Sequence, residues 1–513
     1  MRLLRLLGPL VLLCVGLVGC PEPDPDEGPC GLTEPLEKGQ AGATCNLAQD
    51  CATEFGCMDG RCSSCLASTD CGEFMACNAG SCGQCSLSAP CRDGETCVDG
   101  FCLPEIEDWQ LTFTGEDPEA DWAELQEEIY DDDLYFPCNL RVGTRDYGDC
   151  KVRIQGASSR YFPKKSVRIL FGEGDEHPGF SRKVNLRAEW ADPTFLRTTL
   201  GYATFRRLSR TPTVRTKHVF LHVNGEPHGL MNMVERLGGR FLEENGRDRD
   251  QSLYEAESAP PMGGLMPMPT REAYRFYDDH LQYTKKGGDE HDYRDLIEFI
   301  EQQLWADFVD SPSQEETVIT RTSQVVAMEQ QVEYLALNAL VQNRDHVQSN
   351  FHLSPQLMAD GVRRWEFYPW DLDTTFGCHR PDGWDQTLCE VMDHEVWAYG
   401  GVAPRDELVG GEVENWMNLL IHLTLNEPVC RRRFHVELCD MIRDPWWTED
   451  LEPLMLAFER HLVERVVMDP NVRNPGRAAY SEAIDKLLAY PQLRAQHFRD
   501  RLGCGEPTTT TDP

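Results

Sequence analysis

The sequence predicts an α+β protein in which a disulfide-held N-terminal region precedes one large globular domain. Twelve cysteines recur with fixed spacing between Cys45 and Cys102. Strand patterns ending in tight turns fill much of residues 151–235, and apolar residues at helical spacing dominate after about residue 325. Strands early and helices late favour an α+β fold over regular βαβ alternation.

The N-terminus has the features of an export signal. Arg2 and Arg5 precede a short apolar run that ends in Leu17-Val18-Gly19-Cys20. A basic start, a short apolar core and small residues before the cleavage point are typical of secretory signals. Because Cys20 directly follows Leu-Val-Gly, the segment resembles a bacterial lipobox, and Cys20 is the expected lipidation site of a membrane-anchored lipoprotein. The alternative is an ordinary cleaved signal with a chance cysteine.

Residues 21–44, which begin PEPDPDEGP, are predicted to form a flexible tether. No stretch after the signal has the roughly 18 uninterrupted apolar residues of a membrane helix. The tail at 505–513 is predicted to be disordered. Any chemistry is therefore expected in the globular domain, between about residues 108 and 504.

The cysteine repeat at 45–103 comprises three units of 20 residues with identical internal gaps. Such short units cannot bury enough apolar surface to fold alone, so we expect two disulfides in each. Zinc is the competing interpretation, because Cys62 and Cys65 form a CxxC pair. Among the other cysteines, three close pairs are candidates for local bridges, which leaves Cys30 and Cys504: Cys138 with Cys150, Cys378 with Cys389, and Cys430 with Cys439.

Charge argues against nucleic-acid binding. The 49 basic and 86 acidic residues give a net charge of −37. Nucleic-acid binding by bulk electrostatics is not expected for so acidic a chain, whereas solubility outside the cell is.

Several elements of the globular domain can be predicted. Strands are expected at 166–171 and 218–223, the latter turning at Asn224-Gly225, a favoured hairpin dipeptide, into a returning strand at 229–235. Apolar residues from Val325 to Leu335 predict a helix leading into the loop at 343–350. A further strand is expected at 363–369, and the C-terminal part, including 415–423, is predicted to be mostly helical.

The first candidate site is the segment RIQGASSRYFPKKSVRILF at 153–171. Gly156 and the small residues after it, including Ser158 and Ser159, favour an approach of backbone amides to phosphates. Lys164 and Lys165 follow and are suited to neutralising an anion. The alternative is an edge strand kept from aggregating by its lysines.

The second and third candidate sites carry acidic side chains. Asp345 precedes Asn350 by five positions, the spacing of the protein-kinase catalytic loop. Asp371 and Asp373 follow an apolar strand and are oxygen ligands of the kind that Mg²⁺ prefers. Each alone is also explained as a polar turn. Glu235 is a candidate partner for the lysine. The basic segment, Glu235 and the two acidic sites occur along the chain in the same order as the corresponding functional residues of protein kinases.

These segments resemble the CotH kinase family, the atypical kinases first associated with spore coats. The resemblance covers about 108–504 and depends on GASSRYFPKKSVRI, NLRAEWADPTFLRTTLGY, VFLHVNGEPHGLMNMVE, NRDHVQSNFHL and EFYPWDLDTTFG. It implies a two-lobed kinase-like fold that binds ATP and Mg²⁺ or Mn²⁺.

Site roles follow from the same resemblance. It implies that Lys165, or alternatively Lys164, holds the nucleotide phosphates and that Asp345 is the catalytic base. Asn350 and Asp371 are the implied metal ligands, with Asp373 as the rival for the second. GxGxxG is absent, Asn343 replaces the usual histidine and WDLD replaces DFG, and the family shares these departures.

We therefore expect an exported, lipid-anchored kinase that transfers the γ-phosphate of ATP to Ser or Thr of envelope or surface proteins. The rival is a catalytically inactive binding or adhesion protein on the same scaffold, since fold does not settle function. A third class, a metal-dependent hydrolase using Asp371 and Asp373, would release phosphate without labelling protein.

Overall fold

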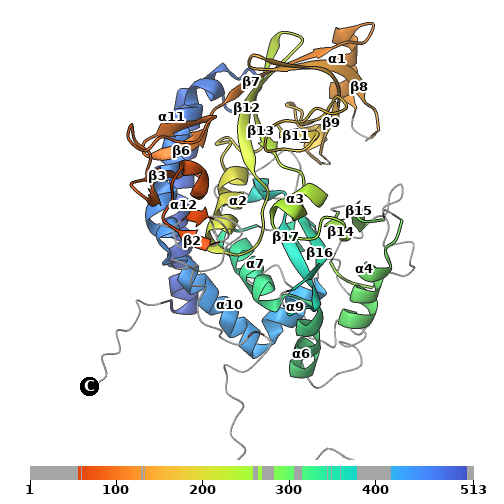
Figure 1. Ribbon diagram of the computed structural model, residues 1–513, viewed down its shortest axis with the longest axis vertical. Helices are drawn as coiled ribbons and strands as arrows, with labels where there is room; N and C mark the ends of the chain where they lie inside the picture. Colours follow the sequence, from red (N-terminus) through yellow and green to blue (C-terminus); the bar gives the residue numbers. More distant parts are fainter. Residues whose placement is uncertain are drawn as a thin grey trace, which may run out of the picture.

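The computed structural model describes Cys30, 56–58, 61–128, 131, 133–156, 158–257, 264–267, 282–289, 291–305, 315–343, 345–347, 349–358, 360–377 and 418–504. A β-barrel occupies one end of the molecule, and a smaller sheet with most of the helices occupies the other (Figure 1). The cysteine-rich hairpins lie along one side against the C-terminal helices. The α+β fold class is confirmed.

The barrel closes seven strands in the order β10-β11-β13-β12-β7-β8-β9. Along β8, buried and exposed residues alternate strictly, and the inward side chains of all seven strands form one apolar core. Cys138 on β8 lies opposite Cys150 on β9 and the two are disulfide-bonded, which confirms that predicted local bridge. The strands are β7 Glu107–Phe113, β8 Phe136–Val142, β9 Arg145–Ile154, β10 Val167–Phe171, β11 Lys183–Arg187, β12 Thr216–Val223 and β13 Glu226–Val234.

The predicted hairpin at Asn224-Gly225 is confirmed. It joins β12 to β13, which pair antiparallel. Asn224 and Gly225 have φ angles of 51° and 89°, the left-handed conformations that this two-residue turn requires. The predicted strand at 166–171 is also confirmed, as β10.

The second unit contains a four-stranded sheet in the order β15-β14-β16-β17. Its strands are β14 Leu253–Ala256, β15 Tyr283–Gly287, β16 Phe351–Leu357 and β17 Arg363–Pro369, the last at the predicted position. The helix predicted to lead into the loop at 343–350 is confirmed as α7, except at its start: Val325 ends α6, and α7 begins at Met328. The break occurs because Val326 forms a β-bridge with Trp365, and the Ala327 N–H donates to the Trp365 carbonyl.

Helices supply the rest of this unit, and the predicted helical C-terminus is confirmed. Buried side chains of the sheet, the C-terminal helices and α2 share one large core. Among the described helices, none is both long and apolar enough to cross a membrane. The helices are α1 Pro118–Glu127, α2 Arg197–Leu208, α3 Gly239–Glu244, α4 Arg294–Glu298, α6 Glu315–Val325, α7 Met328–Leu340, α9 Leu419–Asn426, α10 Pro428–Met441, α11 Leu451–Met468 and α12 Arg477–Leu502, with short turns η2 Ser68–Asp70, η3 Ser158–Tyr161, η5 Phe299–Trp305, η6 Asp345–Val347, η7 Leu372–Thr374 and η8 Trp446–Asp450.

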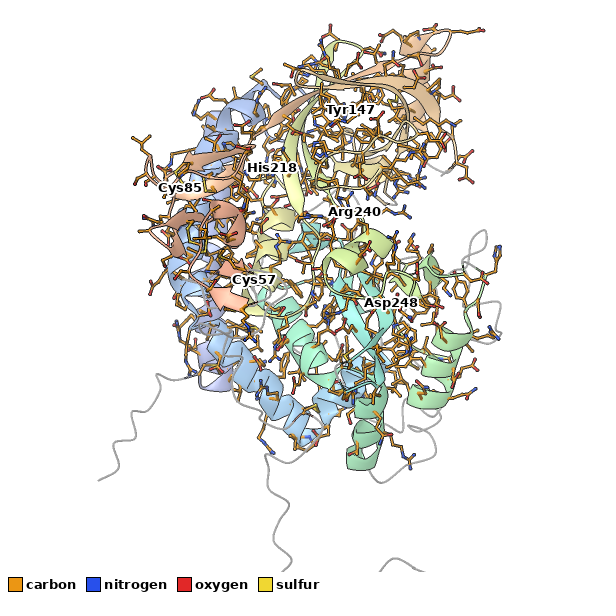
Figure 2. All side chains as sticks on the ribbon, viewed as in Figure 1. Cys57, Cys85, Tyr147, His218, Arg240 and Asp248 are labelled. Carbon is orange, nitrogen blue, oxygen red and sulfur yellow. A yellow bond between two sulfur atoms is a disulfide. The ribbon has the colours of Figure 1, made fainter. Side chains whose placement is uncertain are left out.

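Contacts from α3 tie the two units together. Arg240 of α3 donates to the Phe180 carbonyl of a barrel loop at 2.7 Å and pairs with Glu176 at 3.0 Å. Figure 2 shows Arg240 between the barrel and the second unit.

The cysteine repeats form small hairpins: β1 Gly56–Met58 with β2 Arg61–Ser63, β3 Ala76–Asn78 with β4 Ser81–Gly83, and β5 Glu95–Val98 with β6 Phe101–Pro104. The second repeat has the disulfides Cys65–Cys77 and Cys71–Cys82. The third repeat has the equivalent pair, Cys85–Cys97 and Cys91–Cys102. Two disulfides per unit are therefore confirmed for these repeats, and the zinc interpretation is wrong for them.

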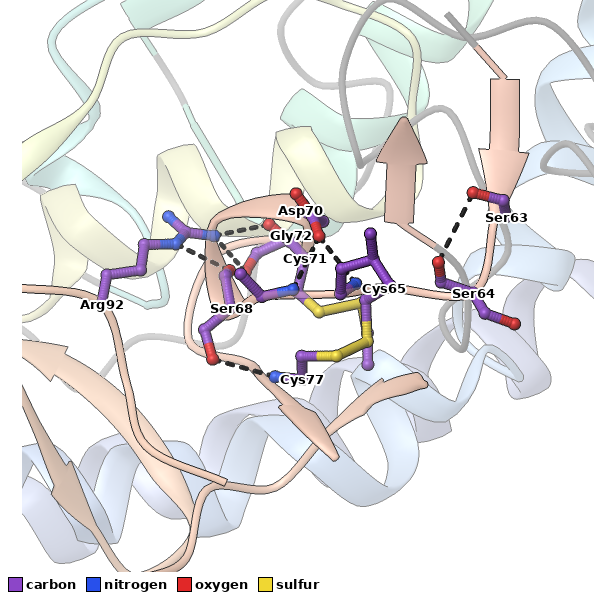
Figure 3. Close-up of a disulfide and its surroundings, with 12 residues drawn as sticks. Ser63, Ser64, Cys65, Ser68, Asp70, Cys71, Gly72, Cys77 and Arg92 are labelled. Atoms are coloured by element: carbon purple, nitrogen blue, oxygen red, sulfur yellow. Dashed lines mark hydrogen bonds between the residues drawn. A yellow bond between two sulfur atoms is a disulfide. The ribbon is translucent and has the colours of Figure 1, made fainter. Parts of the chain in front are cut away.

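The repeats also pack on each other and on the globular domain. Arg92 of the third repeat donates to main-chain carbonyls of the second repeat, including that of Ser68 at 3.0 Å (Figure 3). Phe74 packs edge-on against Phe458 of α11, and Arg206 of α2 binds Glu73. The described repeats are therefore anchored to the globular domain.

Two further disulfides correct the expected pairing. Cys430 bonds to Cys30 rather than to Cys439, and Cys439 bonds to Cys504. The predicted flexible tether is thus fixed to α10 at Cys30, which is buried. The signal with Cys20, the Cys378 and Cys389 pair, and the tail lie outside the described residues.

Candidate active site

Three chain segments meet at the junction of the barrel and the second unit. They are the end of β11, the loop with η6 after α7, and the turn with η7 after β17. Figure 1 places β11 on the side of the barrel that faces α3 and the second sheet. The acidic candidates Asp345, Asp371 and Asp373 all belong to these segments.

Asp371 is held from two sides. The Arg187 guanidinium donates to its Oδ1, and its own N–H donates to the Tyr202 hydroxyl at 3.1 Å. Its backbone is left-handed, with φ 56°. Close packing of α2 supports this turn, because a Cβ at Gly201 would lie 3.0 Å from Leu372.

Asp345 is exposed and bonded to the same turn. The Thr374 hydroxyl donates to Asp345 Oδ2 at 3.2 Å, next to Asp373 in the chain. The buried Asn343 fixes the start of the loop: its Nδ2 donates to Asn338 Oδ1 at 2.8 Å, and its Oδ1 accepts from the Asp345 N–H at 3.3 Å. Asn343, in the place of the usual kinase histidine, is therefore a structural residue of this loop.

Asn350 joins the same arrangement through its backbone. Its carbonyl accepts from the Trp370 N–H at 3.0 Å, directly before Asp371. Its φ of 58° is left-handed, as for Asp371. The structure thus brings the predicted aspartates and Asn350 to one place, although their catalytic and metal-binding roles stay predictions.

Arg187 and Glu189 belong to this site and were missed by the sequence analysis. Burial would lower the pKa of Arg187, but Asp371, Asp373 and Glu189 raise it on balance. Burial raises the pKa of Glu189 to about 8, against the opposing charge of Arg187. Both residues stand in NLRAEWADP, which carried the family resemblance. The sequence signal that was available was the arginine at the end of the strand KVNLR, directly before a turn that contains a second charged residue.

The two lysines of the predicted basic segment lie in different surroundings. Lys164 is fully buried: its Nζ lies 2.6 Å from Asp469 Oδ2 and donates to the Leu230 carbonyl. Lys165 is half-buried and donates to the Arg160 carbonyl at 2.6 Å. Ser158 begins η3, and Ser159 packs so closely on Gly156 that a Cβ there would lie 2.0 Å from its Oγ.

The expected pair between Glu235 and the nucleotide-binding lysine is wrong. Glu235 binds Arg215, with Arg215 Nη2 at 2.7 Å from Glu235 Oε1. In the described part of the chain, neither Lys164 nor Lys165 forms an ion pair with Glu235. The residue paired with an acidic group of the site is instead Arg187, at the end of β11.

The donor set suits a hard cation. Asp371, Asp373 and Asn350 offer oxygen ligands, which Mg²⁺ and Mn²⁺ prefer. Within the described ranges, three close metal-ligand side chains occur only at the cysteine repeats. Mg²⁺ is commonly bound by one or two carboxylates together with substrate phosphates, so a site of this size fits a metal that arrives with a phosphate ligand.

Comparison with known proteins identifies the domain. The family model described as CotH kinase protein matches residues 152–498, more than half of the chain. The chain belongs to the CotH kinase family. It is 24% identical over 385 residues to inner spore coat protein H of Bacillus subtilis (strain 168), covering 74% of this chain and 94% of that protein.

Among solved structures, the HipA, HipB and operator DNA complex of Shewanella oneidensis MR-1 matches with 11% identity, a TM-score of 0.27, and coverage of 77% of this chain and 74% of that chain. A TM-score of this size carries no argument about fold. The assignment to a kinase-like protein therefore depends on the CotH family match, which spans the barrel from β9 onward and most of the second unit.

Proposed function

We propose that this CotH family member is an exported, lipid-anchored protein kinase that transfers the γ-phosphate of ATP to Ser or Thr hydroxyls of envelope or surface proteins. The observation that carries the proposal is the Thr374–Asp345 hydrogen bond beside the Arg187–Asp371 pair. It brings an exposed carboxylate, a possible metal ligand and a cation together, and phosphoryl transfer needs these three.

Asp345 is suited to the acceptor side of the reaction. Its exposed carboxylate can orient a Ser or Thr hydroxyl and accept its proton, while Thr374 fixes the direction of one carboxylate oxygen. On the donor side, Arg187 is suited to binding phosphate oxygens, because a guanidinium binds phosphate through paired donors.

Asn350 and Asp371, with Asp373 as the rival, would hold Mg²⁺ or Mn²⁺ delivered with ATP. The metal, when bound, neutralises charge on the phosphate oxygens. Lys165 and the loop with Ser158 and Ser159 remain the proposed contacts to the outer phosphates. The buried ion pair of Lys164 favours a structural role for that residue.

Export is supported by the disulfides of the repeats and of α10, because structural disulfides persist in oxidising compartments. Lipid attachment at Cys20 is proposed from the lipobox-like sequence alone. A spore-coat location belongs to the named relative, and this protein's acceptor is proposed only as an envelope or surface protein.

One observation favours the rival function, a catalytically inactive binding or adhesion protein. In the structure Asp371 forms an ion pair with Arg187. A carboxylate that stays ion-paired is a poorer metal ligand. The two functions differ in whether ATP and metal displace this pair.

The test is transfer of labelled γ-phosphate from ATP, with Mg²⁺ or Mn²⁺, to the protein and to envelope extract. The oxidised protein lacking residues 1–20 is compared with Asp345→Ala and Asp371→Ala. Label on Ser or Thr that both substitutions abolish supports the kinase. Absence of label, with no nucleotide-dependent change in melting temperature, supports the binding protein, and phosphate release without labelling supports the hydrolase.

A further inference from the structure

Tyr202 joins helix α2 to the turn that carries Asp371. Its hydroxyl oxygen accepts the Asp371 N–H at 3.1 Å, and its side chain is fully buried. Burial raises the pKa of Tyr202 above its usual range, so the hydroxyl stays protonated and its oxygen is a neutral acceptor. Neither the metal chemistry nor the phosphate chemistry proposed above uses this tyrosine.

Helix α2 is a rigid support for the Tyr202 hydroxyl. All of its residues from Arg197 to Arg206 are buried. Near the start of the helix, Arg197 forms an ion pair with Asp192, and near its end Arg206 donates to the Val214 carbonyl at 2.5 Å. Buried side chains that are locked by close packing and hydrogen bonds have little room to move. The Tyr202 hydroxyl is therefore held at a fixed position.

Asp371 adopts a backbone conformation that needs such support. Its φ and ψ angles are 56° and 59°, in the left-handed region. For a residue with a side chain this conformation costs free energy, and it persists only where the surrounding contacts impose it. The hydrogen bond from Tyr202 acts on the Asp371 peptide nitrogen, and the orientation of that N–H about the N–Cα bond is the angle φ. This bond therefore opposes a change of φ directly.

The other contacts of the turn act on the neighbours of Asp371. The Trp370 N–H donates to the Asn350 carbonyl at 3.0 Å. Leu372 packs against α2 at Gly201, where a Cβ would lie 3.0 Å from the leucine side chain. These contacts fix the place of the turn, but they leave the Asp371 N–H to Tyr202.

The direction of the Asp371 carboxylate depends on the same φ angle. A change from the left-handed to the right-handed helical region alters φ by roughly 120° and turns the Cα–Cβ bond with it. The carboxylate would then leave the Arg187 guanidinium, which donates to its Oδ1. In the described part of the chain, Oδ2 has no hydrogen bond or ion pair, and the side chain is 28% exposed. In the observed conformation this second oxygen is therefore available to a metal.

We propose that Tyr202 is a positioning residue of the candidate active site: its hydroxyl holds Asp371 in the left-handed conformation that sets the direction of the metal-binding carboxylate. The inference rests on the proposed function, in which Asp371 is a ligand of Mg²⁺ or Mn²⁺, and names what fixes that ligand. Tyr202 acts through the Asp371 peptide and not on the metal, because its own side chain is fully buried. A ligand that is already oriented binds metal more tightly, since no ordering is needed on binding.

The test measures the binding of Mn²⁺ together with a non-hydrolysable ATP analogue, by calorimetry, to the oxidised protein lacking residues 1–20. The analogue is also titrated without Mn²⁺, so that metal-dependent binding is separated from binding of the nucleotide alone. The variants are Tyr202→Phe, which removes one oxygen, Asp371→Ala, and the double variant. Tyr480→Phe is the matched control, because it removes another buried hydroxyl, which donates to the Thr194 carbonyl at 3.4 Å.

We expect Tyr202→Phe to weaken metal-dependent binding about threefold to tenfold, the effect of one hydrogen bond. Tyr480→Phe should lose a similar amount of stability in urea unfolding but keep the metal affinity of the unaltered protein. Asp371→Ala should weaken binding further. In that background Tyr202→Phe should add nothing, because no carboxylate is left for the tyrosine to position.

Unchanged metal affinity in Tyr202→Phe would overturn the inference, and so would an equal loss with and without the Asp371 carboxylate. Failure of the proposed function has a different result. Metal-dependent binding that survives Asp371→Ala, or no such binding by the unaltered protein, would refute the metal role of Asp371, and the inference would fall with it.

Gly201→Ala is the second variant, for the case in which Tyr202→Phe does not fold. Its Cβ would press on Leu372 and shift the turn away from the Tyr202 hydroxyl without removing a polar group. Metal-dependent binding should weaken in this variant as well. Unchanged binding in Gly201→Ala would overturn the inference.

Discussion

The Arg187 guanidinium donates a hydrogen bond to Oδ1 of Asp371, 184 residues further along the chain. The bond joins the last residue of β11 in the barrel to the turn after β17 in the second unit. The arginine has a raised pKa and stays charged at any physiological pH. The two units therefore meet at a fixed positive charge beside the acidic residues of the candidate site.

The first prediction concerns this arginine. Arg187→Gln keeps a donor but removes the charge, so phosphoryl transfer should fall about 10²-fold or more, as when one electrostatic stabiliser is removed from an active site. Arg187→Lys, which restores charge without the paired donors, should recover part of the rate. Initial rates with labelled ATP measure both variants. Arg141→Gln, which removes an exposed cation at the far end of β8, is the control. An unchanged rate in Arg187→Gln would remove Arg187 from the site.

The second prediction separates Lys164 from Lys165. Lys164→Met leaves the carboxylate of Asp469 buried without its cation, so the free energy of unfolding should fall by about 3–5 kcal/mol. Lys165→Met removes a half-buried ammonium bonded to one carbonyl, which should cost about 1 kcal/mol. Urea unfolding of the oxidised protein measures both.

Nucleotide binding supplies the second readout for the lysines. If Lys165 contacts phosphate, Lys165→Met should weaken ATP binding while the protein remains folded. A Lys164→Met protein that is as stable as wild type but no longer binds ATP would contradict the structural role of Lys164.

The third prediction follows from the pKa of Glu189. Burial raises it from its ordinary value of 4.5 to about 8. Between these values the folded protein keeps a proton that the unfolded chain releases, so this group lowers stability as pH rises from 4.5 to 8 and adds no further slope outside that window.

Glu189→Gln cannot titrate, so its unfolding free energy relative to wild type should rise steadily from about pH 4.5 to 8. The comparison cancels the histidines, whose lowered pKa values act in the opposite direction. Urea unfolding across this pH range measures the difference, with the exposed Glu226→Gln as the control. A constant difference would mean that Glu189 is ionised in the folded protein.

The sequence was sufficient for features encoded locally. The turn at Asn224-Gly225 needs two left-handed residues, and the repeats carry their own disulfides, so both could be predicted. The joining of Asp345 to the turn after β17 was anticipated only through the order of kinase parts. Barrel closure was not foreseen, because it depends on β7 pairing in parallel with β12 across a hundred residues.

Partners of charged residues were the least predictable feature. Lys164 and Asp469 are 305 positions apart, and nothing near either residue indicates the other. Glu235 was expected to bind a lysine but is paired with Arg215, the residue directly before β12.

The fourth prediction tests the long-range disulfides. Digestion under non-reducing conditions followed by mass spectrometry should yield peptides linking Cys30 to Cys430 and Cys439 to Cys504. A peptide linking Cys430 to Cys439 would contradict the structure. Both cysteines of the first pair are buried, so air oxidation of surface thiols does not explain the link.

Removing the Cys30–Cys430 bond by the double substitution to Ser should lower the free energy of unfolding by about 2–5 kcal/mol. The bond spans 400 positions and fixes the segment before the repeats to α10, whereas Cys138–Cys150 closes only 12 positions between adjacent strands. Loop-closure entropy grows with loop length, so the Cys138, Cys150 double substitution should cost less. If the two losses are equal, loop length does not set the contribution of these two disulfides to stability.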